Sequence, residues 1–199
     1  VYDNADVGTA SKVTVSGLSL SGITGTKSSA TTDYGLSTSS RGVSASITEK
    51  PLTLSAIKVY DGTTSLTGSV TLGGMENSET LNYTGATSND SHVATANKYI
   101  SALTLTNGTG LASNYALPAF SYSAVNNNVS ITAATLTPTL SNNNVTKTYD
   151  GATSAPTGFT PTWTYAGLVT GDTAASVAYA RAVYDNADVG TASKVTVSG

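Results

Sequence analysis

Apolar and polar residues alternate along several short stretches of the chain. In residues 12–16, Val13 and Val15 lie on one face of the pattern and polar residues on the other. Residues 18–20, 52–54 and 103–105 repeat this alternation, with two leucines flanking a serine or threonine. A period of two residues predicts β-strands with one buried and one exposed face. No segment shows a long apolar period of 3.6 residues, so we expect an all-β chain.

Clusters of glycine and asparagine separate the predicted strands. They lie at residues 22–25, 73–74, 107–108, 126–128 and 142–144. Glycine adopts positive φ without steric cost and asparagine tolerates it, so both residue types favour turns. Several short strands within about ninety residues, with turn signals between them, predict Ig-like β-sandwich modules. Modules of β-grasp type are the alternative.

The chain repeats itself on two scales. Residues 1–17, VYDNADVGTASKVTVSG, are identical to residues 183–199, so the offset from Val1 to Val183 is 182 residues. Within that period, KVYDGTT at 58–64 recurs as KTYDGAT at 147–153. An identity of this length does not arise by chance. The sequence therefore predicts a window on a tandem array with two alternating modules in each period.

The predicted module boundaries lie near residues 54 and 136. Residues 55–136 form module A. Residues 137–199 form the N-terminal part of one copy of module B, and residues 1–54 form the C-terminal part of another copy. The junctions at 47–51 and 131–138 are short and contain proline. Since short junctions restrict hinge motion, we expect an elongated and fairly stiff array.

Composition narrows the classes of function. The nine Lys and Arg residues are scattered and the formal net charge is −3, so the sequence offers no electrostatic footprint for nucleic acid. No apolar run is long enough for a membrane span. The chain has no Cys, which excludes a disulfide framework. Serine and threonine make up nearly a third of the residues, and this composition is typical of a secreted or cell-surface β protein.

The two Tyr-Asp-Gly elements are predicted to be structural turns. Asp-Gly favours a tight turn at a strand end, in which glycine takes positive φ and the carboxylate accepts backbone N–H groups from the residues that follow. Such turns would fix the register of each module. The predicted turn residues are Tyr60, Asp61, Gly62, Tyr149, Asp150 and Gly151.

The densest acidic spots are the candidates for a metal site. Calcium prefers six to eight oxygen ligands, often from several carboxylates. The chain has only 12 acidic residues and no DxDxDG loop, so we expect no cofactor and keep calcium as the alternative. A Lys–Asn isopeptide crosslink through Lys58 or Lys147 is a further alternative. The candidate calcium ligands are Asp3, Asp6, Asp185 and Asp188.

Catalysis finds little support in the sequence. His92 is the only histidine, it lies in a loop-like stretch, and module B has no counterpart of it. No GxSxG, HExxH or glycine-rich phosphate loop occurs. We therefore expect no enzyme. Trp163 is expected to fill a core, and a sugar-stacking platform is the alternative.

The repeated motifs resemble a known family. KVYDGTT at 58–64, KTYDGAT at 147–153, ADVGTASKVTVSGLSLSG at 5–22, NYAL at 114–117 and SITEKPLTLS at 46–55 are similar to YDG-type and related Ig-like repeats of giant bacterial exoproteins, including haemagglutinin-like adhesins. Module A departs from the family pattern at VATANKYI. The resemblance implies a stalk or matrix-forming part of a secreted or surface adhesin.

The expected function is therefore a structural repeat of a large bacterial surface or extracellular-matrix adhesin, acting as a stalk, spacer or fibre-forming unit. Its partners would be the neighbouring repeats of the same chain and laterally assembled copies, since edge strands offer unpaired backbone groups. The alternative is a module that binds glycans or a surface weakly and gains strength by avidity. Neither reading involves nucleic acid or membrane insertion.

Overall fold

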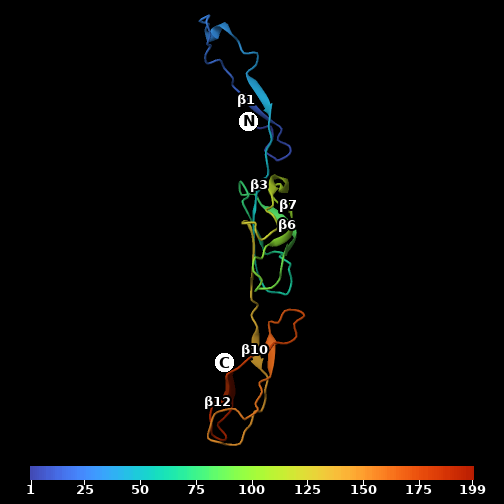
Figure 1. Ribbon diagram of the computed structural model, residues 1–199, viewed down its shortest axis with the longest axis vertical. Coiled ribbons are helices and arrows are strands. Elements are labelled where there is room, and N and C mark those ends of the chain that lie inside the picture. Colours follow the sequence, from blue (N-terminus) through green and yellow to red (C-terminus); the bar gives the residue numbers. More distant parts are fainter. The chain divides into compact units, whose positions relative to one another are not determined.

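The computed structural model describes residues 1–199 and consists of short β-strands and two three-residue 3-10 turns, without an α-helix (Figure 1). The chain is therefore all-β, as predicted. No helix is long and apolar enough to cross a membrane. The elements, in chain order, are β1 (Lys12–Ser16), η1 (Thr31–Asp33), β2 (Ser40–Ser44), β3 (Lys50–Pro51), β4 (Thr53–Val59), β5 (Val70–Gly73), β6 (Leu81–Ser88), β7 (Ile100–Asn107), η2 (Ala112–Asn114), β8 (Tyr115–Ala116), β9 (Asn127–Thr132), β10 (Thr137–Leu140), β11 (Trp163–Ala166), β12 (Arg181–Tyr184) and β13 (Val195–Ser198).

The strands form several small, separate sheets. The largest has three strands in the order β5-β4-β9, with β4 in the centre. Four antiparallel pairs, β1–β2, β6–β7, β10–β11 and β12–β13, and one parallel pair, β3–β8, make up the rest. No sheet has more than three strands.

The chain divides into two compact units. Residues 1–54 belong to unit 1, together with most of the predicted module A. The predicted boundaries near 54 and 136 stay predictions. Unit 1 comprises Val1–Lys58, Thr64–Asp90 and Ala94–Ser130, and unit 2 comprises Val59–Thr63, Ser91–Val93 and Ile131–Gly199.

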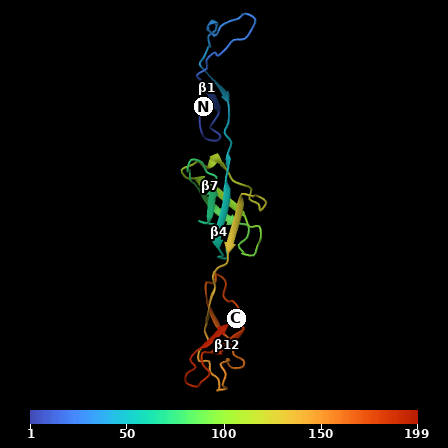
Figure 2. The ribbon, with the colours of Figure 1, turned by 90° about the vertical axis from the view of Figure 1, so that its left-hand side faces the viewer.

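The apolar core of unit 1 follows from the alternation in its strands. In β4, Leu54 and Ala56 are buried, whereas Ile57 is 71% exposed on the other face. Figure 2 shows β4 beside β9, the edge strand of the three-stranded sheet. Val129 of β9 is also buried. Leu52 is completely buried, and burying such a side chain contributes about 1.5–3 kcal/mol.

The β5-β4-β9 sheet and the β6–β7 hairpin both contribute residues to one apolar cluster. Leu52, Leu81 and Tyr115 form its centre. Leu72 of β5 and Leu105 of β7 pack against it. The cluster therefore joins the β5-β4-β9 sheet to the β6–β7 hairpin.

One strand expected from the sequence is missing. Residues 18–20 lie outside any strand, so that prediction is wrong. Gly17 has φ of +72° and turns the chain away after β1. Leu18 N donates to Ser39 O at 3.1 Å, but the hydrogen-bonded pairing of β1 with β2 does not continue beyond this bond. Leu18 is 37% exposed, because no other segment covers this face.

Unit 2 has little buried apolar surface. Ile131 is its only buried hydrophobic residue, at the end of β9. Trp163 begins β11 and is half-buried, so the expectation that it fills a core is wrong. A two-stranded sheet cannot enclose an indole, and residues 1–54, which would complete module B in sequence, lie in unit 1.

Candidate functional site

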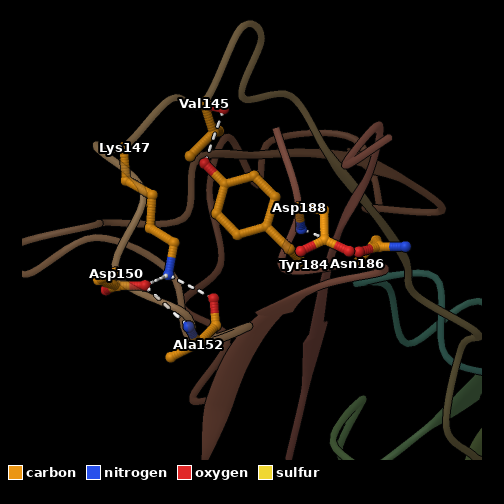
Figure 3. Close-up of polar contacts among 7 residues, drawn as sticks. All are labelled: Val145, Lys147, Asp150, Ala152, Tyr184, Asn186 and Asp188. Carbon is orange, nitrogen blue, oxygen red and sulfur yellow. Dashed lines mark hydrogen bonds and ion pairs between the residues drawn. The ribbon is translucent and has the colours of Figure 1, made fainter. Parts of the chain in front are cut away.

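The second Tyr-Asp-Gly turn, at residues 149–151, is built around Lys147. Its Nζ donates to Asp150 Oδ1 and to the Ala152 carbonyl, each at 2.7 Å (Figure 3). The Ala152 N–H donates to the same Asp150 oxygen at 3.0 Å. Gly151 has φ of +73°, which a residue with a Cβ rarely adopts. One carboxylate therefore closes the turn and pairs with the lysine.

The lysine also faces an aromatic ring. Lys147 Nζ lies 5.7 Å from the centroid of the Tyr184 ring, within the range of a cation–π interaction. The Tyr184 hydroxyl donates to the Val145 carbonyl at 2.8 Å. The Tyr184 N–H donates to Thr153 O at 2.7 Å. These contacts fasten the turn to β12 from both sides.

The charges around Lys147 shift the titration of its partner. The hydrogen bond from Lys147 is the main reason that the pKa of Asp150 lies below its usual value, and the bond from the Ala152 N–H adds to the effect. The Lys147 side chain is only 13% exposed, whereas that of Asp150 is 53% exposed. The pair therefore keeps the lysine in place while its carboxylate partner stays in contact with water.

A surface hollow of about 250 Å³ adjoins this turn. Its lining includes Lys147, Tyr149, Tyr184 and Asp188, together with Ala187, Val189, Gly190 and Ala192. Tyr149 is 60% exposed. The lining therefore combines aromatic, charged and apolar residues.

The first Tyr-Asp-Gly turn, at residues 60–62, has the same hydrogen-bond pattern and a positive-φ glycine, but its neighbouring side chains differ. Asp61 Oδ1 accepts the Thr63 N–H and the Thr63 hydroxyl, each at 2.9 Å, and Gly62 has φ of +79°. The Tyr60 ring stacks on His92, with centroids 6.0 Å apart and an interplanar angle of 27°. His92, the only histidine, is therefore an aromatic neighbour of the turn.

The two turns differ in what precedes them. The first follows directly on β4, as expected of a strand-ending turn. No strand precedes the second, because residues 141–150 lack regular structure, and the expectation of a strand-ending turn is wrong there.

The proposed calcium ligands Asp3 and Asp185 each close a loop. Asp3 accepts the Ser11 N–H at 3.0 Å, the Ser11 hydroxyl at 2.6 Å and the Lys12 N–H at 3.1 Å. Asp185 accepts the equivalent bonds from Ser193 and Lys194 at 2.9, 2.6 and 3.1 Å. We call residues 3–12 and 185–194 the aspartate loops.

These bonds hold both carboxylates in the charged form. The side-chain bond from Ser193, followed by the two backbone bonds, lowers the pKa of Asp185 to about 2. The equivalent bonds from Ser11 and Lys12 lower the pKa of Asp3 well below its usual range. The oxygens that a calcium ion would use are therefore already engaged by N–H and O–H donors.

The other two calcium candidates have different surroundings. The Asp6 carboxylate accepts a hydrogen bond from Asn114 Nδ2 at 2.8 Å, whereas Asp188 is one of the residues that line the surface hollow. No group of three or more His, Asp or Glu side chains is gathered in a way that could hold a metal ion. The structure does not bring the four aspartates together, and calcium binding stays an untested alternative.

Sequence reasoning missed two contributors to these sites. Tyr184 is the second residue of the repeated segment 183–199, and an aromatic residue within this repeat was the available signal. Asn114 begins the NYAL motif at 114–117, but its contact with Asp6 joins residues 108 positions apart. A contact of such sequence separation leaves no local pattern that one sequence could reveal.

Comparison with known proteins places the chain in a family. The YDG domain matches it twice, over residues 48–124 and 132–199, and these segments contain both Tyr-Asp-Gly turns. No curated protein and no solved structure matches the chain. The matched residues cover well over half of the sequence, and the chain therefore belongs to the YDG domain family.

Proposed function

We propose that the chain is a structural repeat of a large bacterial surface or extracellular-matrix adhesin, acting as a stalk, spacer or fibre-forming unit. The observation that carries this proposal is the identity of residues 1–17 and 183–199, which fold into the same aspartate loop twice. An array of identical units adds length or multiplies a contact, which favours a mechanical role.

Several further properties support a structural role. The Tyr-Asp-Gly turns and the aspartate loops use their charged groups to hold backbone, in bonds such as Asp150 to Ala152 and Asp185 to Ser193. The proposed fold of each complete module is an Ig-like β-sandwich, supported by the joint core of the β5-β4-β9 sheet and the β6–β7 hairpin. The proposed location is the cell surface or the extracellular matrix.

Scattering from arrays of different length tests the structural role. Proteins of one, two and three periods of 182 residues would be compared by small-angle X-ray scattering. A stalk or spacer requires the maximum dimension to grow by a constant increment with each period. An array that collapses, so that the third period adds little to the dimension, would contradict the proposal. Surface labelling of intact cells with an antibody against the repeat would test the location.

The hollow beside Lys147 favours a second candidate function, weak glycan or surface binding multiplied by avidity. The exposed Tyr149 offers a ring on which a sugar could stack, and Asp188 a carboxylate that could accept its hydroxyl groups. A glycan array probed with a three-period protein tests this function. Binding that is lost in Tyr149→Ser and kept in Tyr122→Ser, where the exposed tyrosine lies outside the hollow, would support it.

A further inference from the structure

Two loops of the chain have the same backbone structure. We call residues 74–79 and 167–172 the glycine loops, and each follows directly on a strand, β5 or β11. The glycine that begins each loop has positive φ, +92° in the first and +96° in the second. The last N–H of each loop donates to the carbonyl three residues before it, at 2.7 and 3.0 Å. These acceptors are Glu76 and Val169, which therefore hold equivalent positions.

The second glycine loop holds a Tyr-Asp-Gly turn against it. Tyr60 and Val93 line a hollow of about 230 Å³ together with Leu168 and Val169 of the loop. A Cβ built at Gly62 would lie 3.6 Å from Val169 Cγ2, which is an ordinary van der Waals separation. All these residues belong to unit 2. The first Tyr-Asp-Gly turn is thus seated on the glycine loop that follows it in sequence.

An equivalent hollow of about 240 Å³ adjoins the first glycine loop. Its lining includes Glu76 of that loop, Lys50, and the tip of the first aspartate loop, Asp6 and Val7. Lys50 and Glu76 form an ion pair. The lining contains no Tyr-Asp-Gly turn, although the other parts of the second hollow have their counterparts here.

The second aspartate loop indicates which turn fits this hollow. Its tip, Asp188 and Val189, lines one surface hollow together with Tyr149, so the second Tyr-Asp-Gly turn lies beside that tip. In an array with a period of 182 residues, residues 183–199 of one period are residues 1–17 of the next. The turn of each period therefore lies beside the very aspartate loop that lines the first hollow of the following period.

We infer that the turn at residues 149–151 of one period is seated in the first hollow of the following period, against Glu76. The inference rests on the proposed structural role and names the contact that joins successive periods. Because turn and hollow belong to one polypeptide, their effective concentration is on the order of millimolar, and a weak contact is sufficient. The loop residue at this joint is Glu76, paired with Lys50, where the joint in unit 2 has Val169. Each period then has one charged and one apolar joint.

The test uses a protein of two periods, in which residues 1–182 precede residues 1–199. Met75 is the only methionine of the chain, and it lies directly before Glu76 in the first glycine loop. With ¹³C-methyl methionine, each period therefore gives one NMR signal beside its first hollow. We expect one signal at the position found in the 199-residue chain, and a second signal shifted by the Tyr149 ring of the preceding period.

The matched variants replace one tyrosine in the first period only. Tyr149→Ser should return the shifted Met75 signal toward its position in the 199-residue chain. Tyr122→Ser, where the exposed tyrosine lies outside both hollows, should leave the shifted signal in place. Two coincident Met75 signals in the two-period protein, or equal changes in both variants, would overturn the inference. The amide spectrum of each variant shows whether the modules are folded.

The result is independent of the scattering test of the structural role. An array can extend while this hollow stays open, and an array that collapses can still seat the turn. The result also bears on the second candidate function. A Tyr149 ring seated in the hollow is unavailable to a sugar, so this contact would restrict glycan binding through Tyr149 to the last period of an array.

Discussion

The side-chain amide of Asn127 bridges both backbone groups of Ile100. Ile100 N donates to Asn127 Oδ1 at 2.8 Å, and Asn127 Nδ2 donates to Ile100 O at 2.9 Å and to Ala119 O at 3.1 Å. Asn127 begins β9 and Ile100 begins β7, so this buried pair joins strands of two different sheets. The two bonds to Ile100 are buried, so water could not readily replace them.

Removing this bridge should destabilise unit 1. We expect Asn127→Ala to lower the free energy of unfolding by about 1–3 kcal/mol, because it leaves the buried backbone groups of Ile100 without partners. Asn128→Ala, one residue later on the exposed face of β9, is the control and should change the free energy by less than about 0.5 kcal/mol. Urea denaturation followed by circular dichroism measures both. Similar losses in the two variants would contradict the role of the bridge.

The second aspartate loop should lose order in acid. In the folded chain the pKa of Asp185 is about 2, which lies below the value of about 3.9 for an aspartate in the unfolded chain. The bonds to Ser193 and Lys194 therefore contribute stability above about pH 4, and this contribution is lost as the pH falls toward about 2. Amide exchange at Ser193 and Lys194 measures the transition. In Asp185→Asn the exchange rates, corrected for intrinsic chemistry, should show no such pH dependence.

Lys147 should control the titration of Asp150. Lys147→Met removes the donor that contributes most to the lowered pKa of Asp150. We expect the pKa of Asp150 to rise toward the ordinary aspartate value, while the Ala152 N–H bond keeps part of the lowering. The ¹³C chemical shift of the carboxyl group measures this pKa. Lys194→Met, whose exposed side chain is not bound to Asp150, is the control and should leave it unchanged.

The left-handed turn at Gly151 should not tolerate a side chain. A Cβ at Gly151 would meet no atom within 4 Å, so any cost of Gly151→Ala comes from its φ of +73° alone. We expect a loss of about 1–2 kcal/mol in the stability of the turn. Gly35→Ala also meets no atom, at a glycine outside the positive-φ region, and should be close to neutral. Amide exchange at Ala152 for the first variant and at Leu36 for the second measures the local effect.

Chelation should leave the melting temperature unchanged. Asp3 and Asp185 are already bound by serine and backbone donors, so a calcium ion would have to displace three hydrogen bonds at each loop. A site for calcium would stabilise the fold increasingly with ion concentration. A melting temperature that rises with added calcium and falls with chelator would reopen the calcium alternative, with Asp6 and Asp188 as the first ligands to replace by alanine.

The sequence by itself determined the elements that depend on near neighbours. Alternation at 12–16 and 103–105 predicted strands that the structure contains as β1 and part of β7. The Asp-Gly pairs predicted turns, and both glycines have positive φ. Local patterns suffice here because strand alternation and turn conformation are set by a few consecutive residues.

Only the tertiary structure decided which surroundings each repeated segment has. Residues 1–17 and 183–199 have one sequence and one loop, yet Val7 is half-buried and Val189 is 83% exposed. Trp163 is half-buried because its sheet has two strands. Burial depends on segments far away in the chain, such as Asn114 for Asp6, and identical sequences therefore differ wherever those distant partners differ.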